Sequence, residues 1–101
     1  MESPTLISVW TFDEERRGEV LAAINELIDD FLSRQPGFLS SRLYESADGN
    51  TAVVEVQMRT VAERQAVMET PHMLRAMREL RALAHTHSNL YRLVTSVEAP
   101  D

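Results

Sequence analysis

The chain has 101 residues, of which 44% are hydrophobic and 26% charged, and its formal net charge at pH 7 is −6. These values predict one globular domain, residues 1–101, and the acidic balance argues against a nucleic-acid partner. The lack of cysteine excludes disulfides and thiolate chemistry. No apolar run approaches the roughly 20 residues that cross a membrane. The first residues lack the pattern of a signal peptide, so we expect a cytoplasmic protein with no membrane partner.

The first part of the chain predicts a strand followed by a helix. Leu6–Phe12 is apolar and β-branched, which is typical of a strand. After a charged link, Asp13 is placed to cap an amphipathic helix of about 15–18 residues, which Pro36-Gly37 ends. The apolar positions of this helix are Val20, Ile24, Leu27, Ile28 and Phe31.

The central part of the chain predicts a β-hairpin. Phe38–Glu45 and Thr51–Met58 are strand-like, and Asp48-Gly49 between them supplies the positive φ angles of a tight turn. The period of two on the second strand gives one dry face and one mixed face. The dry face carries Ala52, Val54, Val56 and Met58, and the mixed face carries Thr51, Val53, Glu55 and Gln57. We expect helices to pack on the dry face.

The last part of the chain predicts two helices and a strand. Thr60 and Glu63 match a capping box for a short helix that runs to about Glu69. Thr70-Pro71 then starts a second helix, whose apolar stripe is Met73, Met77, Leu80 and Ala84, widened by Leu74 and Leu83. We expect His85–Asn89 to form a polar loop, Leu90–Val97 to form the last strand, and residues 98–101 to form a tail.

The resulting order of elements is β-α-β-β-α-α-β. This order is typical of an α+β fold of the ferredoxin-like, split βαβ kind, with one four-stranded antiparallel sheet. Helices would cover one face of such a sheet, and the other face would need a cover of its own. We expect a second copy of the chain to supply it, which makes a homodimer with a dimeric α+β barrel.

Aromatic and sulfur side chains suggest where a ligand would lie. Trp10 is either part of the core or dimer interface, or an aromatic wall against a planar ligand. Methionines fill irregular space and adapt to flat apolar ligands, although methionine at helical spacing is also ordinary core. Met58, Met73 and Met77 would surround a pliable pocket together with Val54 and Val56.

Several polar residues are candidates for chemistry. Arg75, Arg78 and Arg81 recur every three residues, which is either a solvated stripe or a source of one cation that reaches an apolar cavity. Arg81 lies nearest the apolar stripe, and Arg78 lies further round. Such a cation would stabilise an enolate or phenolate oxygen. Tyr44 would serve as a proton donor, and His72 as a base at a helix N-terminus, unless both are simply surface residues.

His85 and His87, with Asn89 nearby, also raise the question of a metal site. No carboxylate lies close to them in sequence, and the chain has no histidine pair at i, i+4. We therefore expect a solvated loop and no metal.

Taken together, these features resemble the antibiotic biosynthesis monooxygenase family, and within it the anthrone-type polyketide monooxygenases. The resemblance covers residues 5–97 and rests on the whole pattern. Its main features are Pro36-Gly37-Phe38 at the start of the second strand, the Asp48-Gly49 turn and the Thr70-Pro71 helix break.

The resemblance implies a dimeric barrel that uses O2, without metal, flavin or other cofactor, to oxidise a fused-ring phenol at an activated CH2 group to a quinone. The family's cavity tryptophan and asparagine correspond to Met58 and Val54 of this chain. The family's helix arginine corresponds to Arg78, or to Met77 when the helix-break prolines are aligned. The Asn-Trp-His set of the haem-degrading branch is not matched, so we expect no haem.

The main hypothesis is therefore a cofactor-independent monooxygenase that acts on an aromatic polyketide. Arg78 or Arg81 would stabilise the anionic oxygen, and Tyr44 or His72 would supply a proton. Two alternatives remain. One is a related barrel that cyclises a polyketide without O2, and the other is a ligand-binding or accessory protein with no reaction.

Overall fold

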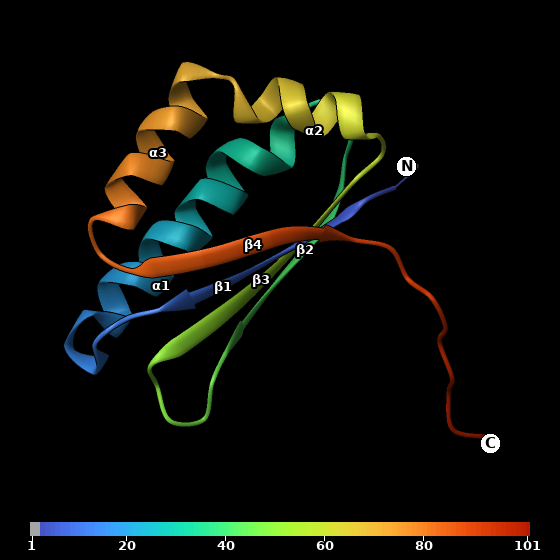
Figure 1. Ribbon diagram of the computed structural model, residues 1–101, viewed down its shortest axis with the longest axis horizontal. Helices are drawn as coiled ribbons and strands as arrows, with labels where there is room; N and C mark the ends of the chain where they lie inside the picture. The colour runs from blue at the N-terminus through green and yellow to red at the C-terminus, as the bar shows by residue number, and fades with distance from the viewer. Residues whose placement is uncertain (1–2) are drawn as a thin grey trace.

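The computed structural model describes residues 3–101 and contains one four-stranded antiparallel sheet with helices on one of its faces (Figure 1). The strand order is β2-β3-β1-β4, as the ferredoxin-like prediction requires. The predicted order of elements is also confirmed. The elements are β1 (Thr5–Thr11), α1 (Arg17–Glu26), β2 (Phe38–Glu45), β3 (Thr51–Met58), α2 (Val61–Met68), α3 (Pro71–Arg81) and β4 (His85–Tyr91).

The hairpin of β2 and β3 has the predicted boundaries. Gly49 has a φ of 81°, and its N–H donates to the Ser46 carbonyl at 3.0 Å, which closes the turn. Residues of β3 alternate between buried and partly exposed along its whole length. The four predicted inward residues, Ala52, Val54, Val56 and Met58, are all buried in the core. The dry face therefore lies under the helices, as expected.

The first helical segment is a composite. A 3₁₀ turn (Glu14–Arg16) leads into α1, and a π-helical turn (Leu27–Phe31) and a second 3₁₀ turn (Leu32–Arg34) follow it. Asp13 occupies the N-cap position of the first 3₁₀ turn, as predicted, but its side chain makes no cap hydrogen bond. The π turn widens the helix locally, a feature common at functional sites.

The caps of α2 and α3 follow the predictions. The Thr60 side chain accepts a hydrogen bond from the Glu63 N–H at 3.1 Å, and that of Thr70 accepts one from the Met73 N–H at 3.2 Å. Pro71 occupies the start of α3, where its missing N–H leaves no bond unmade. The two caps thus define where α2 and α3 begin.

The prediction for the last strand is wrong. The expected polar loop His85–Asn89 belongs to β4, which pairs with β1 from His85 to Tyr91. The strand tolerates polar residues because it lies at the sheet edge with one face open. Beyond Tyr91 the pairing ends where β1 begins, so residues 92–101 carry no regular secondary structure despite their apolar sequence. Leu93, Val94 and Val97 are consequently 80%, 86% and 89% exposed.

Among residues 3–101, no helix is long and apolar enough to cross a membrane. Within the same range, no group of three or more His, Asp or Glu side chains is arranged to hold a metal ion.

Gly37 provides a test of how the helices meet the hairpin. Its φ is 87°, and a Cβ there would lie 2.7 Å from the Cδ of Glu63. Hydrogen bonds from Arg59 and Thr60 hold that carboxyl, and the Arg59 bond keeps the pKa of Glu63 below its usual value. We expect Gly37→Ala to destabilise the protein by more than the roughly 1–2 kcal/mol that a left-handed backbone alone costs.

Gly49→Ala is the matched control for this prediction, measured by urea unfolding. Gly49 has a similar φ of 81°, but the nearest atom to its added Cβ is an Arg17 carbon at 3.6 Å. Equal losses for the two variants would show that the Glu63 side chain moves aside freely.

Candidate functional site

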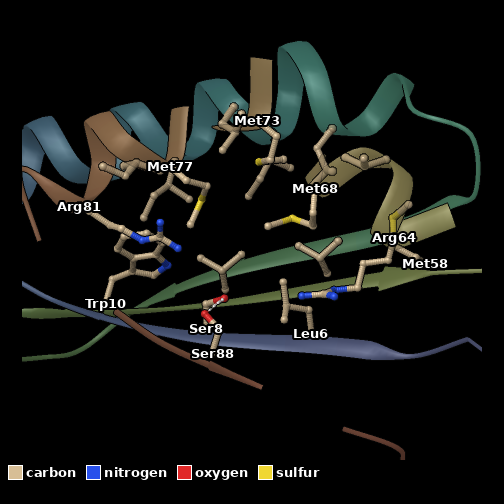
Figure 2. Close-up of a pocket in the computed structure, with 18 residues that line it drawn as sticks. Leu6, Ser8, Trp10, Met58, Arg64, Met68, Met73, Met77, Arg81 and Ser88 are labelled. Atoms are coloured by element: carbon tan, nitrogen blue, oxygen red, sulfur yellow. Dashed lines mark hydrogen bonds between the residues drawn. The ribbon is translucent and has the colours of Figure 1, made fainter. Parts of the chain in front are cut away.

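A cavity of about 200 Å³ lies between the inner face of the sheet and the helices (Figure 2). The sheet contributes Leu6, Ser8 and Trp10 from β1, Val54, Val56 and Met58 from β3, and Ser88 from β4. The helices contribute Ile24, Leu27, Ile28, Leu32, Arg64, Val67, Met68, Met73, Met77, Leu80 and Arg81. Two residues of the π turn, Leu27 and Ile28, are among them. The wall is thus mainly aliphatic, with few polar groups.

Four methionines make this wall adaptable. Met58 and Met73 are 2% and 3% exposed, and Met68 and Met77 are partly buried. Figure 2 shows their sulfur atoms along the helical side and at one end of the cavity. The volume is below the roughly 300–1,000 Å³ of sites for drug-sized ligands. A fused-ring ligand therefore requires some of these flexible side chains to shift, which thioether side chains do readily.

The polar groups lie at both ends and on the floor of the cavity. Arg81 lies beside Trp10 at one end, and the Arg64 side chain enters at the other (Figure 2). Between them the Ser88 hydroxyl donates to the Ser8 Oγ at 2.9 Å and links β4 to β1. Among the described lining residues none is Asp, Glu, His or Tyr. The arrangement can bind and stabilise an anionic oxygen, but it offers no side chain that titrates near neutral pH.

The structure brings together the residues predicted to surround a ligand. Trp10, Val54, Val56, Met58, Met73 and Met77 all line the cavity. Of the two candidate arginines, Arg81 lines it and Arg78 is exposed elsewhere on α3. The prediction that Arg81 lies nearest the apolar stripe agrees with this placement.

The two predicted proton donors lie elsewhere. Tyr44 is 46% exposed and pairs with Val53 on the sheet face away from the helices. His72 stacks on Phe31, with ring centroids 3.9 Å apart and an interplanar angle of 7°. Neither lines the cavity, so neither reaches a ligand held there.

Sequence reasoning missed Arg64, Ser8 and Ser88. Arg64 precedes Val67 and Met68 by three and four residues, so helical spacing alone placed it on the apolar face of α2. Alternation with Leu6 and Trp10 likewise placed Ser8 on the inward face of β1. Ser88 has no such signal, because the polar sequence of His85–Asn89 predicts a loop there.

The comparisons with known proteins agree with this architecture. The family model described as antibiotic biosynthesis monooxygenase matches residues 5–79. A variant of SnoaB, a cofactor-independent oxygenase from Streptomyces nogalater, superposes with a TM-score of 0.88 at 20% identity, covering 98% of this chain and 100% of that one.

Two further solved structures share the fold. A conserved protein from Methanosarcina mazei gives a TM-score of 0.80 at 15% identity, covering 91% and 93% of the two chains. Rv0793 from Mycobacterium tuberculosis gives 0.78 at 20% identity, covering 95% and 100%. No curated protein matches the sequence. At such identities the structures establish the fold alone, and the family model establishes the lineage: the chain belongs to the antibiotic biosynthesis monooxygenase family.

Proposed function

We propose that this protein is a cofactor-independent monooxygenase that oxidises an aromatic polyketide of the anthrone or naphthacenone type to a quinone with O2. The observation that carries the proposal is an apolar cavity with Arg81 at one end and no acidic lining residue among those described. Membership of the family supports an oxygenase. The description of SnoaB as a cofactor-independent oxygenase supports chemistry without a cofactor.

The proposed reaction requires a positive charge near the substrate oxygen and a site that excludes bulk water. A CH2 group between aromatic rings and a conjugated carbonyl loses one proton to give a delocalised anion, whose charge rests largely on the oxygen. Arg81 stabilises that oxygen. The anion gives one electron to O2, and the resulting substrate radical and superoxide combine into a peroxide. Protonation and loss of water leave C=O, so that CH2 and O2 become C=O and H2O.

The lining residues decide where the protons go. With no side chain in the cavity that acts as a base near neutral pH, the first proton leaves to water, which requires a substrate that is already acidic. The Ser8 Oγ accepts from Ser88, which leaves the Ser8 hydroxyl proton free to bond the peroxide oxygen. The apolar wall keeps bulk water from the radical pair.

Oxygen uptake with a simple anthrone tests the proposal. The protein is treated with chelator, receives no flavin, and quinone absorbance is followed in parallel. We expect quinone formation above the spontaneous rate, with one O2 consumed per quinone. The replacement of the family's tryptophan and asparagine by Met58 and Val54 makes a cyclase the second candidate. A cyclase would convert a polyketide equally well under nitrogen, and an accessory protein would show neither conversion nor uptake.

We further propose that the protein is a homodimer, built through the sheet face away from the helices. The helices cover only the other face (Figure 1). The uncovered face carries Ile7, Val9 and Val53, all partly exposed, and Tyr44 and Tyr91, which are 46% and 44% exposed. Apolar and aromatic side chains on an uncovered sheet face fit an interface between identical sheets.

Light scattering of two charge variants tests the dimer. We expect the unchanged protein to be a dimer at micromolar concentration and Tyr44→Glu to be a monomer, because a carboxylate would be buried unpaired in the interface. Leu74→Glu on the helical side is the control, since Leu74 is similarly exposed at 56%. A dimer that tolerates the change at Tyr44 but not that at Leu74 would place the interface on the helices instead.

A further inference from the structure

Arg64 has an unusual environment for an arginine. Its side chain runs from α2 into the end of the cavity away from Arg81, between Met58 and Leu6 (Figure 2). Its Nε is buried and has no hydrogen-bond partner among residues 3–101. A buried charged donor without a partner is costly, and most native arginines avoid it. The position therefore calls for an acceptor.

The nearest acid in sequence does not supply that acceptor. Glu63 directly precedes Arg64, but its carboxylate accepts hydrogen bonds from Arg59 and from the Thr60 hydroxyl. Thus Arg59 is paired, while Arg64, five residues later, directs its side chain into the cavity.

The cavity as a whole concentrates positive charge. Its described lining holds two arginines and no carboxylate, although the chain carries a net charge of −6. Arg81 is exposed to solvent at one end, whereas the Nε of Arg64 at the other end is cut off from solvent and lacks an acceptor among residues 3–101. A ligand with negative charge at both ends would match the two cations and give the Arg64 Nε the acceptor that it lacks.

We infer that Arg64 binds a carboxylate of the substrate, at the end opposite the oxygen that Arg81 stabilises. The guanidinium presents its Nε and a terminal nitrogen side by side, and this fork matches the two oxygens of a carboxylate. The substrate is then an aromatic acid, with an ionisable hydroxyl or keto group at one end and a carboxylate at the other. Binding at both ends fixes the rings lengthwise over the Ser8–Ser88 pair.

The inference refines the substrate of the proposed reaction, but its test does not depend on turnover. The single tryptophan, Trp10, lines the cavity, so quenching of its fluorescence reports a ligand there. The probes are anthraquinone-2-carboxylate and anthraquinone-2-carboxamide, which have nearly the same shape and differ in charge. We expect the carboxylate to bind at least about tenfold more tightly, as for a hydrogen bond to a charged group.

Variants assign that preference to one residue. Arg64→Gln should reduce the preference to about one, whereas Arg64→Lys should retain part of it because the charge remains. Arg75→Gln removes one exposed arginine of α3 and should leave the preference unchanged, which controls for net charge. Thermal unfolding of each variant checks that the fold is intact.

The outcomes separate this inference from the proposed function. Three results would overturn the role of Arg64. They are equal affinity of the unchanged protein for both probes, binding of neither probe, and a preference for the carboxylate that survives in Arg64→Gln. None of these results would contradict the oxidation of anthrone, which carries no carboxylate. A preference that depends on Arg64 in a protein that consumes no oxygen supports the carboxylate site and contradicts the monooxygenase.

Discussion

Replacing Arg81 by alanine should lower the rate of quinone formation by about 10²–10³-fold, the usual effect of removing one donor to a developing oxyanion. Arg81 is the lining cation beside Trp10, and it is also solvent-exposed, which places it at the mouth of the cavity (Figure 2). Its charge lowers the pKa of the bound substrate, since an adjacent cation favours the ionised form. Without it, less substrate is ionised at any given pH.

The pH profile provides a second signature of this role. Since the substrate alone titrates, the rate should rise with pH through the pKa of the bound substrate. In Arg81→Ala that rise should move to higher pH, and in Arg81→Lys it should move less. Arg75→Ala, which removes an exposed charge from the same helix, should leave both rate and profile unchanged. Full turnover by Arg81→Ala would contradict the electrostatic role of Arg81.

Replacing Trp10 by alanine should remove about 3–5 kcal/mol of stability, which is a large part of the 5–15 kcal/mol typical of a domain. Trp10 is 3% exposed and lies on β1, between its partners Ala52 on β3 and Thr86 on β4. Its removal would enlarge the existing cavity at the end beside Arg81 (Figure 2), and the paired strands on either side of β1 limit how far the sheet can collapse into the space.

Urea unfolding followed by circular dichroism measures this loss, because the variant has no tryptophan fluorescence. Trp10→Phe is the control, since it keeps an aromatic ring in the core and should lose far less. A loss of stability below about 1 kcal/mol for Trp10→Ala would mean that the helices move in to fill the space. That result would contradict the expectation that the structure around Trp10 is rigid.

Local patterns predicted most of the fold. The alternation along β3, the Asp48-Gly49 turn and the threonine caps at Thr60 and Thr70 are all set by interactions within a few residues, and the structure contains each of them. The strand β4 was misplaced because its extent is set by a partner about 80 residues away. Register with β1, and not local hydrophobicity, decides which residues of the C-terminal segment pair.

Local patterns also predicted part of the candidate site. Spacing alone placed Val54, Val56 and Met58 on the face that lines the cavity, and helical angle favoured Arg81 over Arg78. The prediction that Tyr44 donates a proton does not agree with the structure, since Tyr44 lies on the opposite face of the sheet.

Helical spacing predicts only part of the position of Arg64. It puts Arg64 on the same side of α2 as Val67 and Met68, but the distance between α2 and β3, which tertiary packing determines, decides how far the side chain enters the cavity.

Isotope labelling tests the central claim most directly. The metal-chelated protein, without flavin, oxidises an anthrone under ¹⁸O2, and mass spectrometry follows the quinone at early times. The account predicts one ¹⁸O atom in each quinone, formed faster than in the absence of protein and slower by about 10²–10³-fold with Arg81→Ala. A labelling rate no greater than the spontaneous one, or a new oxygen that derives from water, would contradict it.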